Sequence, residues 1–235
     1  NIGAPGTFTT GSLASRVDFE VGLNAFTLTV ADLDGDLKPD IAVSNTSGDT
    51  VSVLRNTGTP GLIDAGSFAP KVDFTVGNMP THTVGDLDGD GKPDLIVSSH
   101  SGGTLMVLRN ISSPGSITAD SFAPGVTFTT GTNPRAAALG DVDGDGKLDV
   151  VVVNGGSATL SIYRNQSSAG AFHTSSLAPK VDFPSGPGPY SVHLGDLDLD
   201  GKPDVVVPND NDDTVSVFRN TVSQSPPTIS NITDQ

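Results

Sequence analysis

The stretch GDLDGDGKPDLIV, from Gly85 to Val97, places four aspartates within nine residues. Carboxylates at this density repel one another in water, so the arrangement predicts a positive charge between them. The same plan returns in ADLDGDLKPDIAV from Ala31, GDVDGDGKLDVVV from Gly140 and GDLDLDGKPDVVV from Gly195. The first aspartates of the four stretches are Asp32, Asp86, Asp141 and Asp196, which lie 54, 55 and 55 residues apart. A fixed period of this length predicts a repeat architecture.

The composition fits a metal-binding protein better than a nucleic-acid-binding one. The chain has 235 residues and a net charge of −15, and 16 of its 27 acidic residues lie in the four stretches. Four divalent cations would bring this net charge from −15 to −7. No basic stripe is present that could neutralise phosphates, so we expect no nucleic-acid partner. No apolar run is long enough to cross a membrane, so we expect no membrane insertion.

Each period also contains four strand-like runs separated by turn residues. In the second unit these runs are 81–87, 94–100, 104–110 and 125–131, and the acidic stretch lies between the first two. Glycine and proline are abundant, and no long window has a helical period. Four short strands in each unit predict an all-β fold, a β-propeller of four four-stranded blades of about 55 residues each.

The expected organisation follows from these runs. We predict propeller repeats over residues 1–222, with an outer strand and connector at 1–22 and blades near 23–76, 77–130, 131–185 and 186–222. Residues 223–235, which include Pro226-Pro227, are expected to link to a further domain. The four blades are either a closed four-bladed ring or part of a larger ring.

The acidic stretches have the ligand chemistry of a calcium loop. Numbered from Asp86, the aspartates occupy positions 1, 3, 5 and 9, and Gly91 at position 6 allows a sharp turn. Oxygen ligands at this density suit a hard cation, and calcium accepts an irregular shell of carboxylates better than magnesium does. An EF-hand would need a glutamate at position 12, where this chain has Val97, and flanking helices.

These stretches resemble the FG-GAP or VCBS repeat, the calcium-binding blade of integrin-α-like β-propellers. The resemblance rests on DLDGDLKPD (32–40), DLDGDGKPD (86–94), DVDGDGKLD (141–149) and DLDLDGKPD (196–204), each followed by an apolar strand. It implies up to four Ca²⁺ ions, one in each loop on one face of the propeller. The implied side-chain ligands are Asp32, Asp34, Asp36, Asp40, Asp86, Asp88, Asp90, Asp94, Asp141, Asp143, Asp145, Asp149, Asp196, Asp198, Asp200 and Asp204. The implied backbone carbonyl ligands belong to Lys38, Lys92, Lys147 and Lys202, whose ammonium groups are expected to point outward.

Two leucines depart from the family pattern. Leu37 stands at position 6 of the first loop, where the family favours glycine, so this site is expected to be strained or weak. Leu199 stands at position 4 of the last loop, which supplies no side-chain ligand and is expected to be more tolerant.

Nothing in the sequence forms a convincing catalytic centre, so we expect no enzyme activity. The paired carboxylates repeat in every unit, whereas a catalytic site normally breaks the symmetry of a repeat. The four histidines are scattered. One arginine ends the third strand of each unit, at Arg55, Arg109, Arg164 and Arg219. We interpret these arginines as partners of carbonyls or carboxylates in a neighbouring blade, and Val43, Val97, Val152 and Val207 as core strand residues.

Two sets of loops differ between units and are candidates for a ligand-binding face. They precede the first strand of a unit, as at 23–26 and 187–190, or join its second and third strands, as at 44–49 and 209–214. The strand order of the family places both sets on the face opposite the calcium loops. The most distinctive side chains there belong to Phe26, His100, Arg135 and Tyr190. Ordinary loop variation is the alternative explanation.

The sequence therefore predicts a calcium-stabilised extracellular or cell-surface module for adhesion or for recognition of a protein or glycan. A non-catalytic accessory domain of a larger secreted enzyme, for example one that degrades polysaccharides, is a second interpretation. A structural spacer or fibre subunit is a third.

The two ends of the repeat array raise the question of ring closure. Residues 1–19 match the connector and outer strand at 56–74 in length and pattern, but no inner strands precede them. After Asn220 the repeat stops without such a strand. We expect residues near 17–21 to pair with residues near 214–220, within one chain or between two, so self-association is a possible partner interaction. An upstream blade in a longer parent is the alternative.

Overall fold

The computed structural model describes residues 6, 7 and 9–223. These residues form strands, turns and loops without a helix, and accordingly no helix that could span a membrane occurs among them. The expected linker at 223–235 lies outside the described residues except for Ser223.

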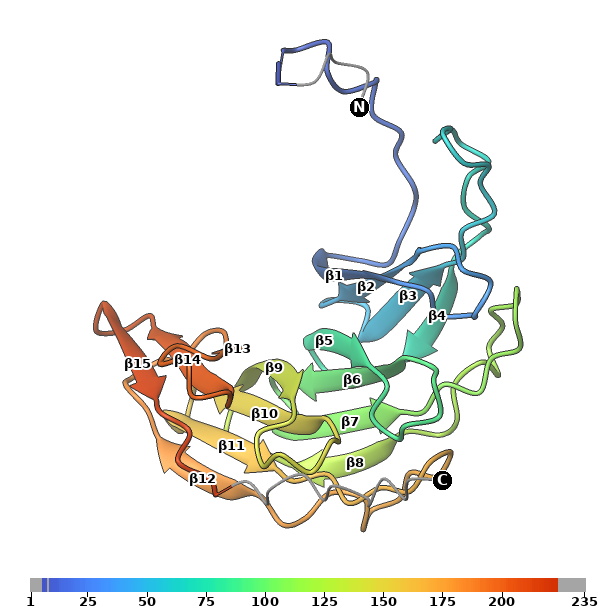
Figure 1. The fold of residues 1–235 in the computed structure, drawn as a ribbon. Helices are drawn as coiled ribbons and strands as arrows, with labels where there is room; N and C mark the ends of the chain where they lie inside the picture. The colour runs from blue at the N-terminus through green and yellow to red at the C-terminus, as the bar shows by residue number, and fades with distance from the viewer. Residues whose placement is uncertain (1–5, 8, 224–235) are drawn as a thin grey trace, which may run out of the picture.

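Fifteen strands form four antiparallel sheets in chain order (Figure 1). Sheet 1 contains β1 (Ala25–Ala31), β2 (Asp40–Asn45), β3 (Thr50–Leu54) and β4 (Val72–Thr75). Sheet 2 contains β5 (Pro80–Gly85), β6 (Asp94–Ser99), β7 (Thr104–Leu108) and β8 (Val126–Thr129). Sheet 3 contains β9 (Pro134–Gly140), β10 (Asp149–Asn154), β11 (Thr159–Tyr163) and β12 (Val181–Pro184). Sheet 4 contains β13 (His193–Gly195), β14 (Asp204–Asn209) and β15 (Thr214–Phe218).

The strands appear where the turn residues and apolar runs predict them. The four strands of sheet 2 begin at or next to the predicted starts at 81, 94, 104 and 125. Each sheet is a simple meander, so consecutive strands are neighbours and each loop crosses only from one strand to the next. The all-β prediction and the repeat of four antiparallel sheets are therefore confirmed, except that sheet 4 has three strands.

The core lies between successive sheets. The second strands β6 and β10 are buried along their whole length, because sheets pack on both of their faces. The predicted core valines are buried, with exposures of 5% for Val43 and 0% for Val97, Val152 and Val207. The first strand of each later sheet also packs against the sheet before it. Val84 of β5 joins the core of sheet 1, and Leu194 of β13 joins the core of sheet 3.

An asparagine links each of the first three acidic loops to the following sheet. Asn165, just after β11, donates its side-chain Nδ2–H to the carbonyl of Leu148 at 2.8 Å and to that of Leu87 in the preceding acidic loop at 2.7 Å. Asn110 and Asn220 make the same cross-sheet bond, to the carbonyls of Leu33 and Val142, both at 2.8 Å. Neighbouring repeats are therefore tied together through the backbone of their acidic loops.

The four sheets form an open arc, with β1 and β15 at its two ends (Figure 1). Val17 to Phe19 form no strand, and no described residue pairs with the outer edge of β15. The expected closure within one chain is therefore wrong for this structure. The N-terminal segment instead stays beside sheet 1, where the Phe19 ring meets the Phe68 ring edge to face at 4.9 Å.

The asparagine bridge can be tested with a control that the chain provides. Asn56 occupies the equivalent position in sheet 1, and its side-chain Nδ2–H donates only to the carbonyl of Pro39 in its own repeat. Asn165→Ala should lower the free energy of unfolding by about 1–2 kcal/mol more than Asn56→Ala, because it also removes the bond to the buried loop of sheet 2. Thermal and urea unfolding measure the difference. Equal losses for the two variants would show that the bridge contributes nothing.

Candidate metal sites

The acidic loops join the first and second strands of each sheet. Backbone amides of each loop donate hydrogen bonds to its carboxylates and fix its conformation. In the second loop, Asp86 accepts from the amides of Asp90 at 3.0 Å and Gly91 at 2.8 Å. Asp88 accepts from Asp90, and Asp90 from Lys92. The chain turns around these carboxylates because each one accepts from an amide further along the loop. The remaining oxygen lone pairs face the same small space.

The aspartate at position 9 anchors the loop to the sheet. One oxygen of Asp94 accepts from the Leu87 amide at 3.0 Å and the other from the Asn110 amide at 2.8 Å. Burial raises the pKa of Asp94 to about 7, although these two hydrogen bonds oppose the shift. Burial likewise raises the pKa of Asp40 and of Asp149 to about 6. Nearby carboxylates add to each shift, so a cation in the loop would relieve a real electrostatic cost.

Two buried carboxylate oxygens provide the test of whether a cation fits. The Oδ2 atoms of Asp34 and Asp88 are buried and accept no hydrogen bond, and both residues are only 2% exposed. Buried carboxylate oxygens without a partner are costly unless a proton or a cation binds them. The donor set is all oxygen, which suits a hard cation. The residues present therefore fit a metal ion.

One group of three aspartates in each repeat has carboxylate oxygens within 4.8 Å of one another. The groups are Asp32, Asp34 and Asp36; Asp86, Asp88 and Asp90; Asp141, Asp143 and Asp149; and Asp196, Asp198 and Asp204. These twelve are among the sixteen predicted side-chain ligands. The role of the other four aspartates, and of the four lysine carbonyls, stays a prediction.

The lysines at position 7 do more than point outward. Lys92 donates its ammonium to the carbonyl of Ser112 at 2.7 Å, and Lys147 does the same to Ser167. Both acceptors lie in the connector of the same repeat. The side chain thus ties the acidic loop to the connector, an arrangement that the sequence analysis did not predict.

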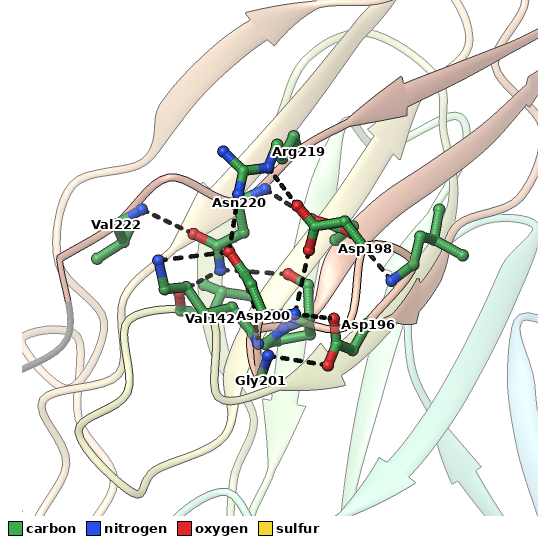
Figure 2. Close-up of polar contacts among 12 residues, drawn as sticks. Val142, Asp196, Asp198, Asp200, Gly201, Arg219, Asn220 and Val222 are labelled. Atoms are coloured by element: carbon green, nitrogen blue, oxygen red, sulfur yellow. Dashed lines mark hydrogen bonds and ion pairs between the residues drawn. The ribbon is translucent and has the colours of Figure 1, made fainter.

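The repeated arginine contacts the acidic loop of its own repeat, so the expected pairing with a neighbouring sheet is wrong. Figure 2 shows Arg219 over the fourth loop, where its guanidinium pairs with Asp198 and Asp200. Arg109 lies 3.9 Å from Asp88 and 3.8 Å from Asp90. The contact with the neighbouring sheet is made by the next residue, as Asn220 does with Val142 (Figure 2). The recurrence of asparagine after each arginine was the signal in the sequence.

Two positions of the loop require a left-handed backbone. At position 6, Leu37 has φ of 66°, in the same region as Gly91 at 88°. At position 4, Leu199 has φ of 63°, where the second loop has Gly89 at 71°. The expectation that position 4 is more tolerant is therefore wrong. A leucine in this region costs roughly 1–2 kcal/mol relative to a right-handed conformation.

The two sets of variable loops come together at the other end of the sheets. The amides of Gly155 and Gly156, in the turn after β10, donate to the carbonyls of Asn133 and Thr132 in the segment before β9. Equivalent bonds join the two loops in repeats 1 and 4.

The four candidate residues of this face occupy different surroundings. The guanidinium of Arg135 lies 5.0 Å from the centre of the Tyr190 ring, a cation–π contact between repeats 3 and 4. Phe26 is exposed on β1, and His100 is half-buried in the turn after β6. Only Arg135 and Tyr190 are thus brought into contact.

The fold and the loops define an all-β repeat protein with one aspartate-rich loop in each sheet. The family model of the FG-GAP-like repeat matches residues 32–97, 86–152 and 141–207, so the chain belongs to the FG-GAP-like repeat family. Each match runs from one acidic loop into the strand that directly follows the next acidic loop. A search among curated proteins finds no significant match to the chain.

Glycine substitutions test the left-handed positions. Leu37→Gly and Leu199→Gly should each stabilise the protein by about 0.5–1 kcal/mol, because relief of strain exceeds the added entropy of the unfolded chain. Affinity for Ca²⁺ as the probe ion should stay equal or rise. Leu197→Gly is the control, since Leu197 is also exposed but has no positive φ. A clear loss of affinity in Leu37→Gly would refute our interpretation of position 6.

Proposed function

We propose that the four loops bind Ca²⁺, up to one ion in each. The supporting observation is that a buried oxygen of Asp34 and one of Asp88 accept no hydrogen bond, although each lies inside a cluster of three carboxylates. The set of clustered carboxylates is not the same in every loop. It includes the aspartate at position 5 in the first two loops and the aspartate at position 9 in the other two. Calcium tolerates such variation, whereas magnesium demands near-octahedral geometry. When bound, the ion cancels the repulsion between the carboxylates.

We further propose that the four sheets are blades of a β-propeller that serves as an extracellular recognition or adhesion module without catalytic activity. The acidic loops at one end are nearly identical, as expected for structural sites. The loops at the opposite end differ between repeats, and the exposed Phe26, together with Arg135 and Tyr190 in cation–π contact, lies in or directly beside them. Loops that vary on a rigid scaffold are the usual location of binding sites. The ligand is a protein or a glycan.

Calcium should raise the stability of the chain. Each site that binds only the folded state adds RT ln(1 + [Ca]/Kd), about 1–3 kcal/mol at ten to a hundred times Kd. Differential scanning calorimetry in EDTA and in roughly 2–5 mM Ca²⁺ measures this gain, in the range where extracellular modules bind. An unchanged melting temperature after complete removal of metal would contradict the assignment.

The increase in the free energy of unfolding that calcium produces should also grow between pH 5 and pH 8. This window is set by the pKa values of about 6 for Asp40 and about 7 for Asp94. Raised carboxyl pKa values favour the protonated native state, so metal-free stability falls as pH rises through 4–7. Calcium binds the deprotonated form and offsets this loss. Buried His82 has a pKa lowered to about 4, so it costs stability as pH falls below 6.5. Comparing EDTA with calcium at each pH cancels the contribution of His82.

The recognition face is tested by binding to a glycan array and a panel of extracellular proteins. For any ligand found, Arg135→Ala combined with Tyr190→Ala should weaken binding about thirtyfold, as expected for stacked aromatic and arginine contacts. Leu62→Ala, an exposed residue of the connector after β3, is the control and should leave binding unchanged. A ligand equally sensitive to both variants, or the absence of any ligand, would favour a spacer or accessory role.

A further inference from the structure

Sheet 4 has an open edge and an exposed apolar face on β15. Val215 and Val217 are 61% and 57% exposed, whereas the equivalent Val51 and Val53 of β3 are fully buried. The difference arises because β4 pairs with β3, while no described residue pairs with the outer edge of β15. An open edge of this kind readily pairs with another strand.

The N-terminal segment has the sequence and side-chain pairing of a fourth strand. Val17-Asp18-Phe19 matches Val72-Asp73-Phe74 of β4 and Val181-Asp182-Phe183 of β12. In those strands a lysine two residues before the aspartate pairs with it, and Arg16 pairs with Asp18 at 3.3 Å in the same way. Val72 lies opposite Val53, and Asp73 opposite Ser52. The same register places Val17 opposite Val217 and Asp18 opposite Ser216.

A hydrogen-bond chain found in sheets 1 and 3 is left unfinished in sheet 4. In sheet 1, Asn45 donates to Ser52 at 2.8 Å, and the Ser52 hydroxyl donates to Asp73 at 2.5 Å. Sheet 3 repeats this with Asn154, Ser161 and Asp182. In sheet 4, Asn209 donates to Ser216 at 2.8 Å, but the carboxylate that would accept from Ser216 is missing from the described part of the repeat. Asp18 supplies that group.

The turn at residues 9–12, just before this segment, has the same hydrogen bonds as the equivalent turns of the other repeats. Ser12 donates its amide to the Thr9 carbonyl at 2.9 Å, and the Thr9 amide donates to the Ser12 hydroxyl at 2.8 Å. Ser67, Ser121 and Ser176 make the same pair of bonds in the other connectors. The segment is therefore preorganised for docking.

The residue after this turn has a cavity to fill. Phe122 and Leu177 follow the turn in repeats 2 and 3 and are 6% and 4% exposed in the core, whereas the equivalent Leu13 is 66% exposed. A largely apolar cavity of about 550 Å³ lies between sheets 3 and 4 and is lined in part by Leu160, Phe183 and Phe218. Leu13 would enter this cavity if its segment paired with β15.

Contacts of the N-terminal segment with sheet 1 indicate the position of the sheet with which this segment would pair. The rings of Phe19 and Phe68 meet at 4.9 Å, as those of Phe74 and Phe122 do between sheets 1 and 2. The segment thus lies against sheet 1 in the way that β4 lies against sheet 2. The sheet that pairs with this segment must therefore lie directly before sheet 1. Sheet 4 of the same chain does not, because it is at the far end of the arc (Figure 1).

The first strands of sheets 1 and 4, β1 and β13, also have surfaces that would fit together if sheet 1 of one copy followed sheet 4 of another. A Cβ on Gly140 would lie 2.5 Å from Leu194 of the next sheet, so glycine is needed for this close approach. At the equivalent Gly195 nothing lies within 4 Å. Val30, which corresponds to Leu194, is 57% exposed on β1. Sheet 1 of a following copy would place Val30 over Gly195.

We propose that two copies of this chain join head to tail. Residues 12–21 of one copy add the fourth strand to sheet 4 of the other copy. Sheet 1 of the first copy then packs against that sheet 4 in the way that successive sheets pack within one chain. The contact is heterologous, so copies either close into a ring or form longer assemblies. The proposal does not depend on the ligand-binding face or on the metal.

Disulfide trapping tests the register, because the chain contains no cysteine of its own. Two single variants, Asp18→Cys and Ser216→Cys, are purified reduced, mixed and oxidised gently. A disulfide in this mixture can join only different chains. We expect a band of twice the chain mass on non-reducing gels that contains both variants, well above the background of each variant oxidised alone.

Matched controls make each outcome decisive. Ser52→Cys with Asp73→Cys in one chain occupies the equivalent pair of sheet 1 and should form an internal disulfide, which shows that the geometry permits the bond. Phe19→Cys mixed with Ser216→Cys is out of register by one residue and should cross-link poorly. If the mixture of single variants gives no mixed dimer while the sheet 1 control forms, the proposal is wrong. An internal disulfide alone in the chain carrying both Asp18→Cys and Ser216→Cys would instead show closure within one chain.

Solution mass provides an independent readout. Analytical ultracentrifugation of the full chain should show association, and Asp18→Ala should weaken it about tenfold, the effect of one hydrogen bond to a charged group. Glu20→Ala removes the same charge from the same exposed segment and should have a smaller effect. A strictly monomeric chain at all concentrations would overturn the proposal.

Discussion

Repulsion between aspartates that the fold holds close together is the constraint on which the structure depends. Three carboxylates in each loop present oxygens within 4.8 Å of one another, and their orientation is fixed by amides of the same loop. Burial raises the pKa of Asp94 to about 7, and the charges of Asp88 and Asp90 add to this shift. Arginines such as Arg109 and Arg219 balance part of this charge, and a proton or a bound cation could balance the rest.

The same loops also join the sheets. The carbonyl at position 2 of one loop accepts from the asparagine of the next repeat, as Leu87 does from Asn165. The position 9 aspartate of that next loop accepts from the Asn165 amide at 2.8 Å. Asn110, Asn165 and Asn220 therefore each contact two successive acidic loops, their own and the one before. Ordering one loop around an ion also orders the surface on which the following sheet packs, so the stability of neighbouring repeats is coupled through short contacts.

Much of this could be predicted from the sequence, because a 55-residue period and alternating turns and apolar runs leave few other folds. The positions of β5 to β8 and the burial of Val97 followed directly. The asparagine recurs after each arginine in the sequence, but its bond to the preceding loop could not be predicted, since the bond depends on how far one sheet lies from the next. The left-handed backbone at Leu199 was missed because position 4 was judged by its ligand role alone. The prediction of closure within the chain was wrong because complementary strand sequences do not show whether the two segments lie close together in one chain.

Calcium binding by the metal-stripped chain is the most direct test of the central claim that the aspartate loops are cation sites. Isothermal titration calorimetry in millimolar Ca²⁺ measures the number of ions bound, and substitution of Asp88 by asparagine identifies the second loop. The account predicts saturable binding that approaches the four loops in number, with one site lost in Asp88→Asn. No saturable binding, or binding that Asp88→Asn leaves unchanged in stoichiometry and affinity, would contradict it.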